Sequence, residues 1–158
     1  IRESDQSVQV IGNFNSENNF TTLENLNNQS ILKTTGRGYF IVGIIHPGQE
    51  PSKHALKDIS MLKNDFEKWG RKMILLFQDK QSADQLNLNE FSNLPNNIVF
   101  GLDNNQLILN EIVKNLNLKS NTSLPVFIIA DTFNRVVFVS QGYTIGIGEQ
   151  LMKVIHGL

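Results

Sequence analysis

Continuous runs of apolar residues alternate along the chain with stretches in which apolar residues recur at helical spacing. Tyr39–Ile45 is a continuous apolar run, which is typical of a strand covered on both faces. Between Ser52 and Trp69 the apolar residues recur at intervals of three and four, and this spacing predicts one amphipathic helix that Gly70 ends. The same criteria predict further strands at 8–11, 30–33, 72–77 and 97–101, and further helices at 82–87, at 105–116 and from 146 to the C-terminus.

Two apolar runs near the C-terminus, 126–130 and 135–139, are separated by only four residues. Such a short connection joins antiparallel strands, so we expect a β-hairpin here. The earlier strands alternate with helices instead, which implies parallel neighbours joined by right-handed crossovers. The predicted fold is therefore an α/β sandwich, in which a mixed central sheet carries helices on both faces.

The composition narrows the function mainly by exclusion. The chain has 158 residues, enough for one domain whose core needs neither disulfides nor a metal. With 14 Lys and Arg against 15 Asp and Glu, it lacks the basic field that attracts nucleic acids and anionic membranes. It contains no cysteine, which excludes disulfides, thiolate metal sites, iron–sulfur clusters and cysteine nucleophiles. No apolar run approaches the roughly 20 residues of a membrane helix, and the first residue is Ile1 rather than Met, so we expect a piece of a larger protein.

Few side chains have a pattern that predicts chemistry. Ser52 stands where the long helix is expected to begin, and serine favours the N-cap position, so we expect it to cap the helix. The alternative is a catalytic serine, which would need a nearby base such as His46 or His54. These two and His156 lack metal-ligand spacing, so we expect no metal or other cofactor. The glycine-containing stretch 142–148 lacks the dinucleotide fingerprint and the P-loop lysine, which argues against a phosphate site.

The turn that follows Tyr39–Ile45 resembles a known active site. An apolar strand, a turn with a proline and a helix also occur in extracytoplasmic thiol–disulfide oxidoreductases of the thioredoxin-like superfamily, around a motif of roughly Trp-Cys-x-Pro-Cys. Here the matching stretch is Gly48-Gln49-Glu50-Pro51-Ser52. Pro51 matches the motif proline, Gln49 and Ser52 stand where the two cysteines would be, and Gly48 replaces the tryptophan.

A second stretch resembles the cis-proline loop of the same superfamily. Ser123-Leu124-Pro125 precedes an apolar strand that ends at Asp131, and Asn134 stands in the hairpin turn where the family has a glycine. Asparagine tolerates positive φ almost as glycine does, so the turn is compatible with the family's. The resemblance implies that the Leu124–Pro125 bond is cis.

The resemblance implies a single thioredoxin-like domain over 1–158, a three-layer α/β/α sandwich with a mixed central sheet. Its core would be 30–158, and 1–30 would be an N-terminal extension or β-hairpin region. Thiol–disulfide exchange is excluded, because a helix dipole contributes at most about 2 kcal/mol, or roughly 1.5 pKa units, which does not ionise a serine. Glutamine does not ionise at all, and neither residue is a redox group.

The expected function is therefore a redox-inactive interaction or structural module of a larger bacterial exported protein, in the periplasm or at the cell surface. The vestigial turn is Gln49, Glu50, Pro51 and Ser52, and the expected peptide groove consists of Gly48, Gln49, Ser52, Leu124 and Pro125. The expected partners are an extended peptide or protein segment and the other domains of the parent chain, with no nucleic acid and no membrane insertion. The alternatives are a domain that retains an enzymatic role of the oxidoreductase family, a non-redox enzyme dependent on Ser52, and a structural spacer whose groove binds nothing.

Overall fold

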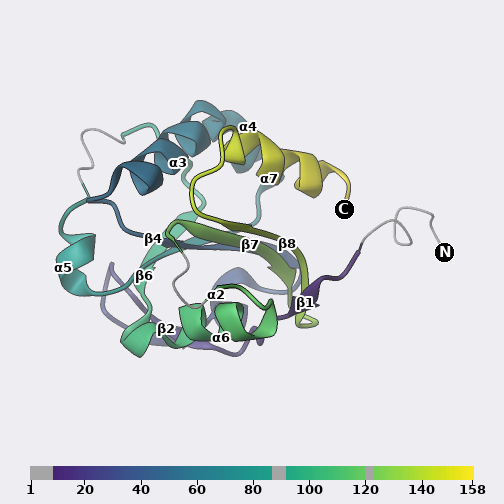
Figure 1. The fold of residues 1–158 in the computed structure, drawn as a ribbon, viewed down its shortest axis with the longest axis horizontal. Helices are drawn as coiled ribbons and strands as arrows, with labels where there is room; N and C mark the ends of the chain where they lie inside the picture. The colour runs from purple at the N-terminus through teal and green to yellow at the C-terminus, as the bar shows by residue number, and fades with distance from the viewer. Residues whose placement is uncertain (1–8, 87–91, 120–122) are drawn as a thin grey trace.

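The computed structural model describes residues 9–86, 92–119 and 123–158. In this part of the chain, eight strands form one sheet in the order β1–β8–β7–β4–β5–β6–β2–β3 (Figure 1). In chain order they are β1 (Gly12–Asn13), β2 (Asn19–Thr22), β3 (Asn28–Ser30), β4 (Tyr39–Ile45), β5 (Met73–Phe77), β6 (Ile98–Leu102), β7 (Val126–Asp131) and β8 (Arg135–Gln141).

Helices cover both faces of this sheet. One face carries α3 (Glu50–Met61), α4 (Lys63–Trp69) and α7 (Ile147–His156), and the other carries α2 (Ile31–Thr35) and α6 (Leu107–Asn115) (Figure 1). The short helix α5 (Lys80–Ala83) follows β5, and the 3-10 turn η1 (Asn104–Gln106) precedes α6. The three-layer α/β/α arrangement is the predicted one.

The sheet is mixed, as predicted. Strands β4, β5 and β6 are parallel, whereas β4 pairs with β7 and β7 with β8 in antiparallel fashion. The hairpin turn between β7 and β8 contains Asn134 at φ 67°, the positive φ expected there. Side chains of successive strand residues point alternately into an α3-side core, which includes Ile41 and Leu75, and an α6-side core, which includes Val42 and Ile74. Strands β4, β5 and β7 are buried on both sides, which explains their continuous apolar sequences.

Two predictions about elements before residue 70 are wrong. The strand expected at 30–33 is instead the start of α2, because the Ser30 hydroxyl accepts the Lys33 N–H and caps that helix. The single helix expected from Ser52 to Trp69 is two helices, α3 and α4, which meet at the non-helical Leu62. Gly70 ends α4 in a left-handed conformation, as predicted.

Other element boundaries shift. The predicted strand 8–11 begins at Val8, which lies outside the described residues, and the observed strand is β1 at Gly12–Asn13. The predicted helix 82–87 ends outside the described residues, and α5 begins earlier because the Asp79 carboxylate accepts the Ser82 N–H and caps it. The helix predicted at 105–116 begins only at Leu107, after η1.

The described part of the N-terminal region contributes to the same core. It supplies β1 at one edge of the sheet and the β2–β3 hairpin at the other. Phe14 and Phe20 are fully buried in the α6-side core. Residues 9–30 therefore complete the sandwich on both sides of the central strands.

Candidate functional site

The sheet register brings the turn after β4 next to the loop before β7. Ile44 of β4 lies opposite Val126 of β7 in an antiparallel ladder. The ladder ends there, with Ile45 and His46 following Ile44 along the chain and Leu124 and Pro125 preceding Val126. The Leu124–Pro125 peptide bond is cis, as expected. The 46–52 turn and the proline loop therefore lie at the same end of the sheet.

The N-terminus of α3 presents the first three residues of the vestigial turn, Gln49, Glu50 and Pro51, to solvent. Gln49 is the N-cap residue with an extended backbone, φ −107° and ψ 142°, and its side chain makes no capping hydrogen bond. Gly48, Glu50 and Pro51 are exposed with it, and Pro51 sits in the first turn, where its missing N–H costs no helical hydrogen bond. The exposed Glu50 carboxylate lies 3.7 Å from Lys53 Nζ.

Ser52 does not cap the helix, so that prediction is wrong. The helix begins at Glu50, which makes Ser52 its third residue and turns its side chain inward. Ser52 is fully buried, and its Oγ accepts the His46 backbone N–H at 3.0 Å. The Ser52 hydroxyl therefore stabilises the turn between β4 and α3 and does not cap the helix.

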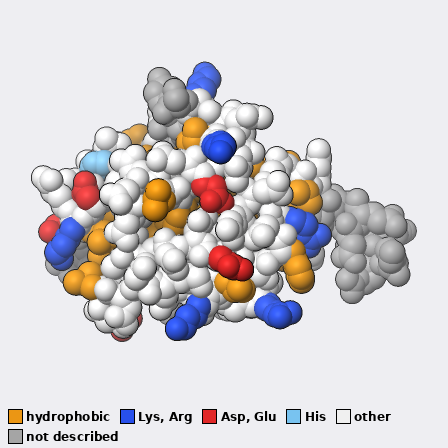
Figure 2. All heavy atoms as spheres, turned by 90° about the horizontal axis from the view of Figure 1, so that it is seen from below, with side chains coloured by type: hydrophobic (Ala, Val, Ile, Leu, Met, Phe, Trp, Pro, Cys, Tyr) orange, Lys and Arg blue, Asp and Glu red, His pale blue; other side chains and the backbone are white. Residues whose placement is uncertain are grey.

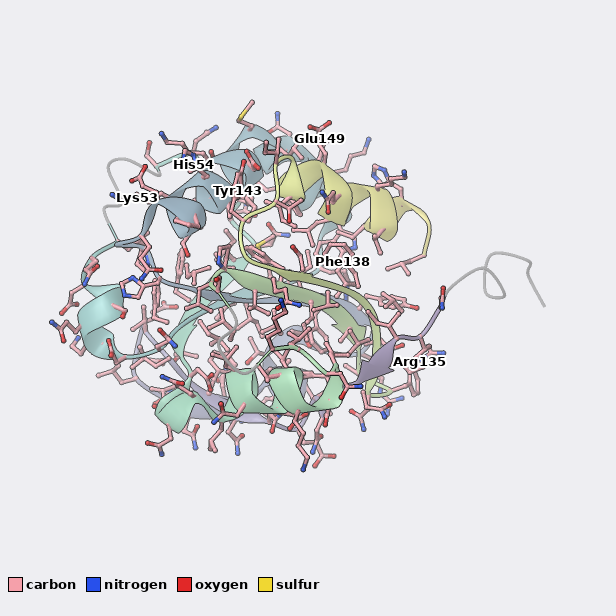
Figure 3. The ribbon with its side chains drawn as sticks, in the orientation of Figure 1. Lys53, His54, Arg135, Phe138, Tyr143 and Glu149 are labelled. Carbon is pink, nitrogen blue, oxygen red and sulfur yellow. The ribbon has the colours of Figure 1, made fainter. Side chains whose placement is uncertain are left out.

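The structure does not pair Ser52 with a base. Residues two apart on a helix point in different directions, and His54 faces solvent while Ser52 faces the core. The His54 ring lies against Tyr143, with ring centroids 5.4 Å apart, between α3 and the loop that leads to α7 (Figure 3). The Tyr143 hydroxyl donates to Asp58 Oδ2 at 3.1 Å, and partial burial together with this carboxylate raises the pKa of Tyr143. These contacts hold α3 to the C-terminal segment, and they give the Ser52-enzyme alternative no geometric support.

Three further residues lie around the exposed turn: His46, which the sequence suggested only as a base for a catalytic serine, and Asp79 and Gln85, which it did not suggest. His46 Nδ1 is buried and has no hydrogen-bond partner among the described residues. Asp79 stays charged beside it, because the Ser82 N–H and, to a smaller degree, the His46 ring lower the pKa of its carboxyl. The Gln85 side chain lies directly on Gly48, where a Cβ would come within 1.7 Å of its amide oxygen. The segment after α5 therefore lies against the turn, and a larger side chain at position 48 would require the Gln85 side chain to move.

The proline loop leaves one backbone unit available. The carbonyls of Ser123 and Pro125 both accept the Gly142 N–H, at 3.0 and 2.9 Å, which ties the loop to the end of β8. Leu124 lies between these two residues, and its backbone N–H and C=O bond to no described residue. Its side chain is half-buried. The loop is thus anchored on both sides of a free amide and an apolar side chain.

Metal-binding clusters and membrane-spanning helices are both absent from the described ranges. These ranges contain no cluster of three or more His, Cys, Asp or Glu side chains that could hold a metal ion. Within the same ranges, no helix is long and apolar enough to cross a membrane. Seen from the side of α2 and α6, the surface carries separate basic and acidic side chains with apolar ones between them, rather than a field of one sign (Figure 2).

No protein-family model and no curated protein matches the chain. Solved structures do match along nearly its whole length. A thiol:disulfide interchange protein DsbE from Chlorobium tepidum aligns with a TM-score of 0.67 and 10% identity over 96% of this chain and 99% of that one. BsSco, of the Sco family of cytochrome c oxidase assembly proteins, aligns with a TM-score of 0.65 and 14% identity over 96% of each chain. The chain has a thioredoxin-like fold.

Within that fold, the chain lacks the cysteines that thiol–disulfide chemistry requires, because it contains none. A third structure, a thioredoxin-like protein from Bacteroides caccae, aligns with a TM-score of 0.63 and 13% identity over 98% of this chain but only 51% of that one. Similarities at this level of identity establish the fold and leave the activity to be argued from the residues.

Proposed function

We propose that this chain is a redox-inactive thioredoxin-like domain that binds an extended peptide or protein segment. In its proposed groove of Gly48, Gln49, Ser52, Leu124 and Pro125, the exposed Gly48 and Gln49 and the half-buried Leu124 would contact the segment, and the buried Ser52 and Pro125 would support them from below. The observation that carries the proposal is the Leu124 backbone unit, which bonds to no described residue and lies at the same end of the sheet as the exposed turn at the N-terminus of α3. An unpaired N–H and C=O next to an apolar side chain suit an extended segment, which pairs through its main chain and inserts a side chain.

Two physical arguments favour binding over catalysis. Thiol–disulfide exchange proceeds through a thiolate, and the chain has no thiol. Ser52 is buried and spends its oxygen on the His46 N–H, so it offers no accessible nucleophile. The turn then offers a helix end without a side-chain cap and an exposed glutamine amide, and the proline loop at the same end of the sheet is tied to Gly142 by two hydrogen bonds.

The wider context is part of the same proposal. We infer that the domain belongs to a larger bacterial exported protein and acts outside the cytoplasm. The thioredoxin-like neighbour of which this chain spans about half supports the first statement, since a fold of this kind occurs there within a longer chain. The similarity to DsbE and Sco structures supports the second.

The proposal is tested by titrating the ¹⁵N-labelled chain with carboxymethylated insulin B chain, a soluble extended probe without free thiols. Saturable amide shifts are expected at Gln49, Ser52 and Leu124, and none on α6. Leu124→Ala should weaken binding by about tenfold, which corresponds to about 1.4 kcal/mol. Leu118→Ala, at an equally half-buried leucine elsewhere, should not. Unperturbed amides around Ser52 and Leu124 at saturating probe would contradict the proposal.

A further inference from the structure

The outer edge of β6 is only half covered. β2 pairs with its C-terminal half, where Thr21 lies opposite Leu102 and Thr22 opposite Gly101. The last contact is the Leu23 N–H, which donates to the Phe100 carbonyl at 3.0 Å. The chain then turns away towards β3, so no strand in the described part of the chain covers Ile98 on the side away from β5.

Backbone alternation shows which groups are left at this edge. The Met73 N–H donates to the Asn97 carbonyl, and the Asp103 N–H donates to the Phe77 carbonyl. Between residues 97 and 103, the backbone N–H and C=O groups of the odd-numbered residues therefore point towards β5. The N–H and C=O of Ile98 must then point away from β5, towards the uncovered edge. No described residue bonds either group. β6 is also less buried than β4, β5 and β7, as an incompletely covered edge should be.

A pocket of about 650 Å³ runs along this edge. On the α3 side of the sheet its wall is apolar, and the side chains there pack against the α3-side core: Leu23, Ala83, Leu86, Ile98 and Phe100. The pocket is open to the edge itself, so an extended chain placed in it would contact this wall on one face.

The opposite wall of the pocket is cationic. Lys72 precedes Met73, whose side chain faces the α3 side, so alternation directs Lys72 to the other face. Lys33 reaches the same wall from α2, which covers that face. Neither lysine pairs with a carboxylate in the described part of the chain, and the acidic residue among the described lining residues is Glu24, in the turn that leaves β2.

We propose that this edge of β6 binds an extended peptide strand in which apolar and acidic residues alternate. Successive side chains of a strand point to opposite faces, so one set would lie on the apolar wall and the other would reach Lys33 and Lys72. The Ile98 N–H and C=O would supply the main-chain hydrogen bonds. This surface lies across β5 from the β4–β7 groove and is independent of it.

The test uses the full ¹⁵N-labelled chain and an acetylated, amidated hexapeptide of alternating valine and glutamate. We expect saturable amide shifts at Ile98 and Phe100, and slower hydrogen exchange of the Ile98 amide. The same peptide N-methylated at alternate residues, or with lysine in place of glutamate, should bind at least about tenfold more weakly. Lys33→Gln with Lys72→Gln should weaken binding by at least about fivefold, whereas the matched pair Lys57→Gln with Lys114→Gln should not.

Three results would overturn this proposal. They are an absence of saturable shifts at Ile98 at millimolar peptide, equal binding of the N-methylated peptide, and equal binding of the valine–lysine peptide. In the last case the two lysines would serve to protect an open edge against strand pairing rather than to recruit a partner. If the shifts at Ile98 are absent and shifts appear only at Ser52 and Leu124, the groove under Proposed function is supported instead.

Discussion

Replacing Gln49 and Ser52 together with cysteine should restore a disulfide at the N-terminus of α3. Gln49 has an extended N-cap backbone and Ser52 is the third residue of the helix, so the two side chains lie across a single turn. Within a regular helix, positions three apart have Cβ atoms about 5–6 Å apart, whereas a disulfide needs about 3.5–4.5 Å. The non-helical N-cap is the feature that lets this pair come closer.

The structure also predicts how reactive the first cysteine would be. Position 49 is exposed at the helix N-terminus, where the dipole contributes up to about 2 kcal/mol and lowers the pKa of a thiol from about 8.5 to about 7. At pH 7 the thiolate fraction would rise from about 3% to about half. The second substitution exchanges the buried acceptor of the His46 N–H for a weak one, so the reduced variant should be about 1 kcal/mol less stable.

Free thiols are counted after incubation with oxidised glutathione, and the pH dependence of iodoacetamide alkylation reports the thiol pKa. The matched control is Lys57→Cys with Ser60→Cys, which has the same spacing inside α3. We expect the 49/52 pair to oxidise and the control pair to stay largely reduced. A 49/52 variant that stays fully reduced would show that this turn is not a former cysteine site.

Three further predictions concern stability. Ser52→Ala leaves the His46 N–H without its buried acceptor, so it should lower the free energy of unfolding, measured in urea, by about 1–3 kcal/mol. The control Ser60→Ala loses an exposed hydrogen bond and should lower it by at most about 0.5 kcal/mol. Equal losses of stability would contradict the role given to Ser52. Gly43→Ala would place a Cβ 2.6 Å from a neighbouring aromatic ring in the centre of the sheet, so it should cost about 1–3 kcal/mol by the same assay, and an unchanged stability would refute the close packing of β4. Burial raises the pKa of the Asp103 carboxyl, so the folded state favours its protonated form. As pH rises from the ordinary carboxyl range to the raised pKa, the wild type should therefore lose stability relative to Asp103→Asn. Above the raised pKa the difference in stability should level off. Urea unfolding between about pH 3 and pH 7 measures this, and the opposite slope would show that the backbone N–H bonds to this carboxylate outweigh its burial.

The central sheet is the part of the fold that the sequence predicts best. The continuous apolar runs of β4 and β5 are too short to cross a membrane, so they fit strands buried on both faces. The three residues between β7 and β8 leave room only for a hairpin. The short elements near the N-terminus are harder, because Ile31 and Leu32 fit a strand as well as a helix. There the Ser30 cap, a single hydrogen bond, decides the outcome.

The candidate site was predictable only where residues are contiguous. The resemblance to a redox motif places Gln49, Pro51 and Ser52 in one turn, but it does not reveal that the helix starts early enough to bury the serine. The contact between Gln85 and Gly48 joins two loops that follow neighbouring parallel strands, and no local pattern encodes it. The available signal was that Gly48 stands where the resembling family has a tryptophan.

The most direct test of the retained groove is hydrogen exchange at the Leu124 amide with and without carboxymethylated insulin B chain. The account predicts that this amide exchanges readily in the free chain and at least about tenfold more slowly at saturating probe, while amides of α6 keep their rates. Exchange at Leu124 that is unchanged by a probe shown to bind elsewhere on the chain would contradict it.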